Sequence, residues 1–308
     1  MNQPNIKQPI VSGVIPALIT PYNREGGVAL DILGALVKRL VADGADGFYV
    51  GGSTAECFLL SDRERQEILE CVLEAAAGRV PVIAHVGHIA TSRAITLARH
   101  ARHAGATAVS SVPPFYYNFS REEIIGYYAA VAQAAQLPLI PYSIPAFSGV
   151  AITADVLADM VKEVPVAGIK YTSYDLFELE RIRRRFPEIC VLNGHDEVFC
   201  NALPTGIDGA IGSTYNLLTP RFQAILSAYR AGDTVRAAQL QHEVNKLIDL
   251  FIEVGVLPAI KYLLGVSGLP CGDCRPPFNP LTAAQRQRLD AACDAVFATA
   301  AETTKLVG

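Results

Sequence analysis

The sequence predicts an α/β protein, a (β/α)8 TIM barrel with a C-terminal helical extension. Three observations lead to this fold class. Short apolar runs alternate with amphipathic segments from residue 14 to about residue 232. There are eight such runs, the number that closes a barrel of this type. Beyond residue 232 only helical periodicity remains. We therefore expect a barrel domain over 10–232 and a C-terminal helical region over 233–308.

The apolar runs are the predicted strands. Their near-continuous hydrophobicity is typical of a parallel sheet that helices cover on its outer face. A doubly wound open sheet is the alternative, which the lack of a G-x-G-x-x-G turn after the first run disfavours. The runs lie at 13–20, 47–50, 81–86, 108–112, 138–144, 166–170, 190–193 and 209–212.

The segments between the strands carry helix start and stop signals. Ser61 with Glu64, and Ser120 with Glu123, fit the capping-box pattern that satisfies free amides at a helix N-terminus. After the barrel, further helices are expected at 233–253, 256–266 and 282–301. Glycines that suit a left-handed helix end stand before three strands, at Gly44, Gly105 and Gly206.

Composition excludes several classes of function. A formal charge of −4 without a basic block gives no general reason to bind nucleic acid or an acidic membrane. The N-terminal residues lack a signal-peptide pattern, and no run of about 18 apolar residues suggests a membrane span. The one basic cluster, "RIRRRF" at 181–186, alternates with apolar residues as a solvated helix face does. We therefore expect a cytoplasmic protein.

Seven cysteines are scattered through the chain. An odd number in a long chain argues against a disulfide framework and for reduced, mostly buried thiols. Cys271 and Cys274 form the one close pair, but neither a thioredoxin-like unit nor a second ligand pair accompanies them. We expect them to be structural.

The active site of such a barrel lies at the C-terminal ends of its strands. The residues that close each run are therefore the candidates for chemistry. They include Ser53, Thr54 and Glu56 after the second run, His85 and His88 after the third, Tyr116 and Tyr117 after the fourth, Tyr142, Lys170 and Thr172, Asp196 and Glu197, and Ser213 and Thr214.

Lys170 ends an apolar run that should be buried, within "VAGIKYTSYD". A lysine in a barrel mouth loses hydration, which disfavours the ammonium form and leaves an amine able to attack a ketone carbonyl. The alternative is a lysine that reaches water or pairs with Asp175 or Asp196. Position alone does not decide between these readings.

Neighbouring residues suit imine chemistry at Lys170. Tyr142 closes the adjacent strand, and a phenol beside an imine-forming amine can shuttle protons; a tyrosine that only packs the mouth is the alternative. "GGSTAE" (51–56) offers backbone amides and hydroxyls for a carboxylate, or is a simple tight turn. "GAIGST" (209–214) follows the eighth run. The main competing use of this loop is to cradle a phosphate group, as loops at this position of a barrel commonly do.

The sequence offers no convincing metal site. His85 and His88 stand three residues apart at a strand end, but without nearby carboxylates they read as ordinary polar lining. We therefore expect no metal and no cofactor.

Six motifs occur in order between residues 51 and 216: "GGSTAE", "PPFYYNFS", "PYSIPAFSG", "GIKYTSYD", "NGHDEVF" and "GAIGSTYN". Together they resemble the class I pyruvate-dependent aldolases of the dihydrodipicolinate synthase and N-acetylneuraminate lyase family. The likeness covers nearly the whole chain, and its lyase branch fits best.

The resemblance implies a role for each matched residue. Lys170 would form an imine with pyruvate, and Tyr142 would act as general acid/base beside it. Tyr116 would complete a hydroxyl relay in a neighbouring subunit, in an assembly that is usually a homotetramer. The family implies that Ser53 and Thr54 receive the pyruvate carboxylate and that the sugar-binding positions are Thr172, Gly194, Asp196, Glu197 and Ser213.

The branch implies cleavage of N-acetylneuraminate to pyruvate and N-acetylmannosamine. Dihydrodipicolinate synthases carry an arginine after the proline of the Tyr142 motif, whereas this chain has Ala146 and Phe147 there. Ionised Asp196 and Glu197 accept hydrogen bonds only, which suits a substrate rich in hydroxyls. Another 2-keto-3-deoxy sugar acid, a dihydrodipicolinate synthase-like condensation and a non-catalytic sugar-acid binding module stay open. The motifs depart from the lyase pattern at Ala55, Ser143 and His195.

Overall fold

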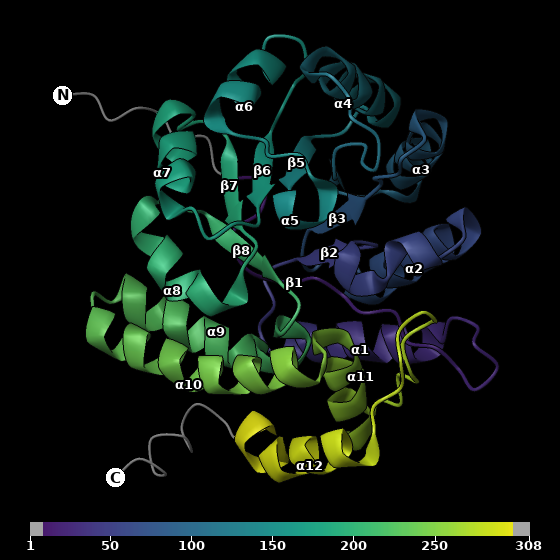
Figure 1. Ribbon diagram of the computed structural model, residues 1–308, viewed down its shortest axis with the longest axis vertical. Coiled ribbons are helices and arrows are strands. Elements are labelled where there is room, and N and C mark those ends of the chain that lie inside the picture. The colour runs from purple at the N-terminus through teal and green to yellow at the C-terminus, as the bar shows by residue number, and fades with distance from the viewer. Residues whose placement is uncertain (1–8, 298–308) are drawn as a thin grey trace.

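The computed structural model describes residues 9–297, and its centre is a barrel of parallel strands (Figure 1). The strands neighbour one another in the order β1-β8-β7-β6-β5-β4-β3-β2. A parallel bridge between Ala17 and Tyr49 brings β1 against β2, so the sheet curls nearly to closure. The strands are β1 (Gly13–Pro16), β2 (Phe48–Val50), β3 (Val82–His85), β4 (Ala108–Ser111), β5 (Leu139–Ser143), β6 (Gly168–Tyr171), β7 (Cys190–Asn193) and β8 (Gly209–Gly212).

All eight predicted strands are therefore confirmed. The first is shorter than expected, because the chain leaves the regular ladder after Pro16. Thr20, at the end of the predicted run, instead donates its hydroxyl to the carbonyl of Ala55, 2.9 Å away in the loop after β2.

The alternation of side chains along each strand separates two cores. In β6, Ile169 and Tyr171 point outward into the large core between barrel and helices. Lys170 lies between them in sequence and therefore points into the barrel. The inner core is smaller, and its residues include Ile15, Tyr49, Ile83, Ile140, Tyr142, Leu192 and Ile211.

Helices cover the barrel on its outside (Figure 1). Ser61 and Ser120 form the predicted capping boxes with Glu64 and Glu123 at the starts of α2 and α4. Gly105 ends α3 with a φ of 92°, a left-handed conformation that glycine adopts without a Cβ clash. The barrel helices are α1 (Leu30–Ala42), α2 (Asp62–Ala76), α3 (Thr91–Ala104), α4 (Arg121–Ala135), α5 (Pro145–Ser148), α6 (Ala154–Met160), α7 (Leu176–Arg185), α8 (Phe199–Ala202) and α9 (Tyr215–Arg230).

The C-terminal helices follow the prediction closely. They are α10 (Thr234–Val254), α11 (Val256–Val266) and α12 (Ala283–Phe297), and α10 packs along α9. The predicted end of the last helix, at 298–301, lies outside the described residues. Within residues 9–297 no helix combines the length and apolar character needed to cross a bilayer.

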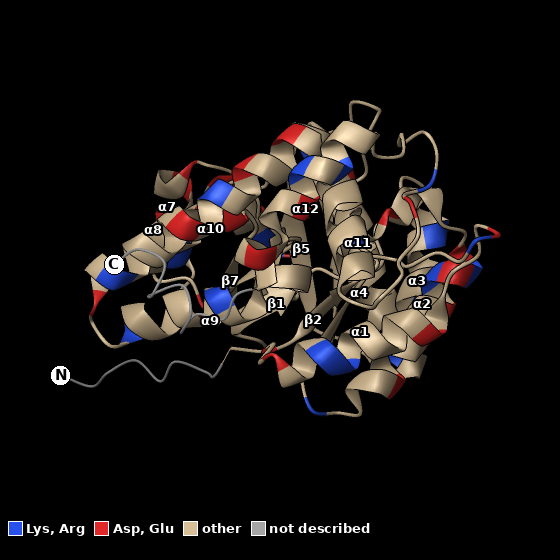
Figure 2. Ribbon diagram, turned by 90° about the horizontal axis from the view of Figure 1, so that it is seen from below, with Lys and Arg blue, Asp and Glu red and all other residues tan. Residues whose placement is uncertain are grey.

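Charged residues are distributed over the outer helices, with acidic and basic positions interspersed along the ribbon (Figure 2). The "RIRRRF" segment lies on α7, where its arginines pair with acidic neighbours as expected of a solvated face. Arg181 and Arg185 reach Asp155, and Arg184 binds Glu180 within the helix. These arginines are therefore paired with acidic residues of α6 and α7.

Candidate active site

A cavity of about 820 Å³ opens at the C-terminal ends of the strands. Its walls come from the loops of the barrel, from α10 and α11, and from residues 278–282 before α12. This volume lies within the usual range for small-molecule sites. Of the ten residues to which the family resemblance assigns a role, nine line it: Ser53, Thr54, Tyr142, Lys170, Thr172, Gly194, Asp196, Glu197 and Ser213.

Lys170 reaches this cavity from inside the barrel. Its side chain is buried, with 4% of the residue exposed. Tyr142 is its partner on the adjacent strand, and the Nζ atom lies 4.0 Å from the centroid of that ring. The ring of Tyr49 faces the same atom at 4.4 Å. The alternative partners are engaged elsewhere, since Asp175 caps α7 and Asp196 accepts hydrogen bonds from Thr214.

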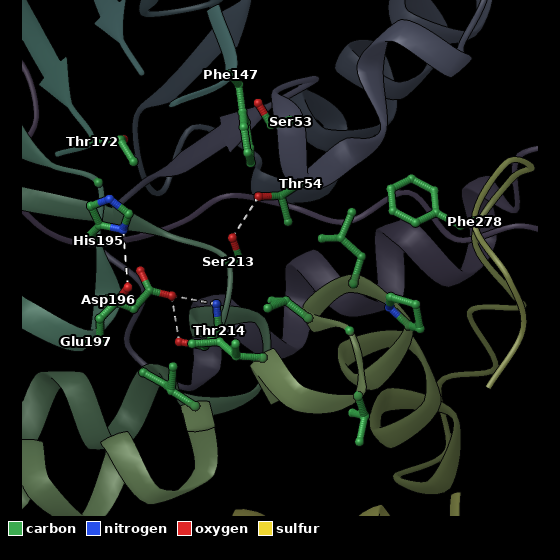
Figure 3. Close-up of a pocket in the computed structure, with 18 of the residues that line it drawn as sticks. Ser53, Thr54, Phe147, Thr172, His195, Asp196, Glu197, Ser213, Thr214 and Phe278 are labelled. Carbon is green, nitrogen blue, oxygen red and sulfur yellow. Dashed lines mark hydrogen bonds and ion pairs between the residues drawn. The ribbon is translucent and has the colours of Figure 1, made fainter. Parts of the chain in front are cut away.

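The loop after β2 presents hydroxyl groups to the cavity. Ser53 to Ala55 form the short 3-10 helix η1, and both Ser53 and Thr54 line the cavity. The hydroxyls of Thr54 and Ser213 lie 3.0 Å apart and form a hydrogen bond (Figure 3). The loops after β2 and β8 are thereby joined at the edge of the cavity.

Asp196 is a buried carboxylate in the lining of the cavity, next to Thr214. It starts the 3-10 helix η3 (Asp196–Val198), and Oδ2 accepts from the Thr214 amide at 2.9 Å and from its hydroxyl at 2.7 Å. Burial raises the pKa of Asp196 to about 6, against the lowering effect of the Thr214 bonds. Because Asp196 already occupies the amide of Thr214, the phosphate-cradle reading of "GAIGST" is disfavoured.

Glu197 belongs to a small aromatic and acidic cluster. Its Oε1 accepts from the Tyr174 hydroxyl at 2.5 Å and lies 3.3 Å from His195 Nδ1. The His195 ring stacks on Tyr174 with centroids 4.2 Å apart. Burial acts to raise the pKa of Glu197, but the bonds from His195 and Tyr174 outweigh it and hold the pKa at about 2. Glu197 is therefore a fixed anion at this end of the cavity.

Thr172 and Gly194 fit together closely. A Cβ atom on Gly194 would lie 1.8 Å from the Thr172 hydroxyl oxygen, so a larger residue is excluded unless Thr172 moves. That oxygen is buried and has no hydrogen-bond partner within the protein. It is a polar atom that a substrate hydroxyl can satisfy.

Two departures from the lyase motifs turn out to be structural. Ser143 is fully buried, and its hydroxyl accepts a hydrogen bond from the Ile152 amide at 3.0 Å. Ala55 occupies the 3-10 turn, a conformation that needs no glycine. His195 is the departure that reaches the cavity.

His85 at the end of β3 and His88 just after it are held by backbone groups. His85 Nδ1 donates to the Gly51 carbonyl at 2.8 Å, and Nε2 accepts from the Val112 amide at 3.3 Å. Burial lowers the pKa of His85 well below its ordinary value, so the ring is neutral. His88 Nδ1 accepts from the Ala90 amide. Among residues 9–297 no group of three or more potential ligands is arranged for a metal.

The cysteines are free thiols, as the sequence suggested. Burial raises the pKa of Cys271 and of Cys274 to about 12, which disfavours the reactive thiolate.

Tyr116 is the candidate that does not reach the cavity of its own chain. It is 84% exposed, has a φ of 78°, and packs edge-on against Tyr117. Its side chain is therefore exposed on the single chain and is not part of the cavity wall.

Sequence reasoning missed the apolar side of the cavity. Phe278 lies across the pocket from Asp196 (Figure 3). It carries no chemical signature, and helical periodicity does not show which residues of a helical tail fold over the barrel mouth. The other missed apolar residues include Ile248, Ile252, Val254, Val256, Leu257, Pro258, Pro280 and Leu281.

A model of the Dihydrodipicolinate synthetase family matches residues 10–296. The N-acetylneuraminate lyase of Citrobacter koseri is 45% identical over 273 residues, which cover 87% of this chain and 91% of that protein.

Solved structures show the same architecture. CdNal from Clostridium difficile, in complex with mannosamine, superposes with a TM-score of 0.90 at 33% identity, covering 93% of this chain and 99% of that one. A catalytic lysine mutant of the Ruminococcus gnavus sialic acid aldolase gives a TM-score of 0.91 at 30% identity, with coverage of 93% and 96%.

Proposed function

Because this chain belongs to the dihydrodipicolinate synthetase family, we propose that it is a class I aldolase that cleaves N-acetylneuraminate to pyruvate and N-acetylmannosamine. The observation that carries the proposal is the buried amine of Lys170 against Tyr142 at the base of a cavity with one polar wall. Relatives named N-acetylneuraminate lyase and sialic acid aldolase support the substrate.

Lys170 supplies the chemistry that the cleavage needs. Its amine adds to the ketone of the open-chain sugar acid, and loss of water gives an iminium ion. The bond between C3 and C4 of the sugar acid then breaks. Its electron pair forms an enamine between C2 and C3, while the C4 hydroxyl loses its proton and becomes the aldehyde of N-acetylmannosamine. Protonation of the enamine and addition of water release pyruvate and restore the amine.

Tyr142 is the proton carrier in this scheme. Its ring lies against the Lys170 amine, on the neighbouring strand. A phenol in this place can donate to the departing hydroxyl during dehydration, and the resulting phenolate can accept the proton of the C4 hydroxyl during cleavage. The iminium ion itself is the electron sink, so the proposal includes no metal or cofactor.

The two ends of the substrate meet different groups. Ser53 and Thr54 would receive the carboxylate of the keto acid from the loop after β2. The hydroxylated tail would extend toward the opposite loops, where Asp196 and Glu197 accept hydrogen bonds. Thr172, Gly194 and Ser213 complete this wall.

The assembly belongs to the same proposal. Tyr116 projects outward, and we propose that it completes the proton relay of a neighbouring subunit in a cytoplasmic homotetramer. Its exposure and its displacement from the cavity of its own chain support this arrangement.

Trapping with borohydride tests the mechanism. Reduction in the presence of pyruvate should add a pyruvate-derived mass to the peptide that carries Lys170 and inactivate the protein. Lys261 should stay unmodified, since it is buried against Glu56. A label on Lys261, or no label on any lysine, would contradict the imine mechanism.

Substrate comparison tests the specificity. Pyruvate should be released faster from N-acetylneuraminate than from a short 2-keto-3-deoxy acid. The reverse order would favour the alternative substrate that His195 leaves open. Faster condensation of pyruvate with aspartate semialdehyde than with N-acetylmannosamine would leave only the family membership standing.

A further inference from the structure

A buried ion pair lies outside the lining of the cavity and joins distant parts of the chain. Lys261 Nζ lies 2.6 Å from Glu56 Oε1, and the two side chains are 1% and 0% exposed. Glu56 follows the η1 loop after β2, whereas Lys261 belongs to α11 of the C-terminal region. The motif "GGSTAE" therefore ends in a residue that binds the helical extension.

The same carboxylate also holds the segment that precedes α12. Glu56 Oε2 accepts from the Arg275 amide at 2.7 Å, and the Arg275 guanidinium donates to the carbonyl of Leu59 at 2.9 Å. The Tyr22 ring lies 4.0 Å from Lys261 Nζ and 4.5 Å from the Arg275 guanidinium. In Figure 1 the purple segment after β1 and the yellow segment before α12 accordingly lie side by side.

Backbone geometry makes the loop dependent on this anchor. Glu56 has a φ of 57°, a left-handed conformation that is uncommon for a non-glycine residue, and its buried side chain is held by Lys261 and Arg275. Glu56 is two residues beyond Thr54, and its amide closes the 3-10 turn on the Ser53 carbonyl at 3.0 Å. The orientation of the turn that presents Ser53 and Thr54 therefore follows the position of the Glu56 side chain.

Stability alone does not explain a buried pair of this kind. The desolvation of two charges offsets much of their attraction, so apolar residues of similar volume often serve folding equally well. A buried ion pair does constrain the structure, because it holds the two segments that carry the charges in one relative position.

We propose that Glu56, Lys261 and Arg275 are positioning residues, which fix the loop of Ser53 and Thr54 for the carboxylate of the keto acid. Residues 278–282, which line the outer cavity, follow Arg275 and the two prolines after it, and we infer that they share the anchor. The C-terminal extension thus sets the geometry of the pyruvate end of the site. This inference rests on the proposed function.

Labelling of Lys170 with two different carbonyl compounds distinguishes this positioning role from a general effect on stability. Pyruvate and acetone both form a ketimine with an amine, but only pyruvate carries a carboxylate. The measurement is the concentration of each that half-saturates borohydride labelling of Lys170. In Lys261→Met and in Glu56→Leu/Lys261→Met, the value for pyruvate should rise roughly 10-fold, as loss of a charged hydrogen bond predicts. The value for acetone should stay near that of the parent.

The double variant leaves no unpaired buried charge, so it decides the matter if Lys261→Met does not fold. Lys261→Arg should keep pyruvate half-saturation within about three-fold of the parent, because the charged donor is retained. Leu264→Ala is the matched control: it lies on α11, is buried, and does not line the cavity. It should lower the thermal midpoint without changing either half-saturation.

Each remaining outcome overturns the inference. Equal shifts for pyruvate and acetone would indicate a general effect on Lys170, and unchanged values would show that the loop needs no anchor. If no variant of the pair folds, the pair is a folding element. Failure of the parent to be labelled at Lys170 would instead contradict the proposed function.

Discussion

At the scale of single residues, the proposed chemistry depends on the pair of Lys170 and Tyr142. Tyr142→Phe removes one oxygen atom and keeps the ring against the amine, so the fold should be retained. Turnover should fall roughly 10²- to 10⁴-fold, the usual effect of losing general acid/base catalysis. Steady-state kinetics measure the fall, and circular dichroism checks the fold. Turnover within a few-fold of the parent would exclude Tyr142 from the proton path.

The pKa of Asp196 leads to a prediction about how the stability of the fold depends on pH. Its pKa rises to about 6 in the folded protein, mainly through burial. Since the unfolded value is lower, the folded protein holds the proton more tightly. This favours folding at low pH, and the benefit is lost as pH rises through about 6. The linked free energy is about 3 kcal/mol.

Asp196→Asn removes this titration while keeping an oxygen that can accept from Thr214. The stability of the variant relative to the parent should therefore increase between pH 5 and pH 7.5. Urea unfolding at several pH values measures the difference. A difference that is constant over this range would show that Asp196 does not titrate there.

At the scale of elements, local sequence patterns were enough to predict the barrel. They were not enough to predict the distant contacts that hold its loops in place. Alternating apolar runs and capping boxes are readable because their partners are close in sequence, as Ser61 and Glu64 are. Candidate residues at strand ends followed from one rule of barrel architecture. Glu56 and Lys261 are 205 residues apart, and nothing in either neighbourhood marks the other. The apolar cavity wall was missed for the same reason.

The junction of β8 and η3 shows how closely two loops are fitted. A Cβ atom on Gly212 would lie 2.1 Å from Asp196 Oδ1 and 2.6 Å from the Tyr215 ring. Gly212→Ala should therefore displace Asp196 and cost about 2 kcal/mol or more of stability. N-Acetylneuraminate cleavage should suffer more than imine trapping with pyruvate.

Gly126→Ala is the matched control for Gly212→Ala. Gly126 is an exposed residue within α4, and nothing lies within 4 Å of the Cβ that alanine would add. The same substitution should stabilise the helix by about 0.5–1 kcal/mol and leave activity unchanged. Thermal unfolding compares the two variants, and equal midpoints would remove the steric argument at Gly212.

At the scale of the whole molecule, Tyr116 does not line the cavity of its own chain. Its side chain is 84% exposed, and neighbouring Tyr117 is exposed as well. Large exposed aromatic groups of this kind are typical of surfaces that meet a partner. If Tyr116 serves the cavity of a second subunit, each complete active site contains residues from two chains.

Mixed oligomers test this arrangement. Lys170→Met and Tyr116→Phe should each be severely impaired alone. In a pair of one subunit of each kind, the Tyr116→Phe subunit keeps its lysine and receives an intact Tyr116 from its partner, so one site is whole. Equal co-expression should then restore about a quarter of the parental sites, because half of the random pairs are mixed and half of their sites are complete. Were Tyr116 to act within its own chain, every site in the mixture would lack one residue, and activity would stay at the level of the separate variants. Sedimentation of the mixture shows that the subunits have assembled, so that a lack of recovery counts against the shared site.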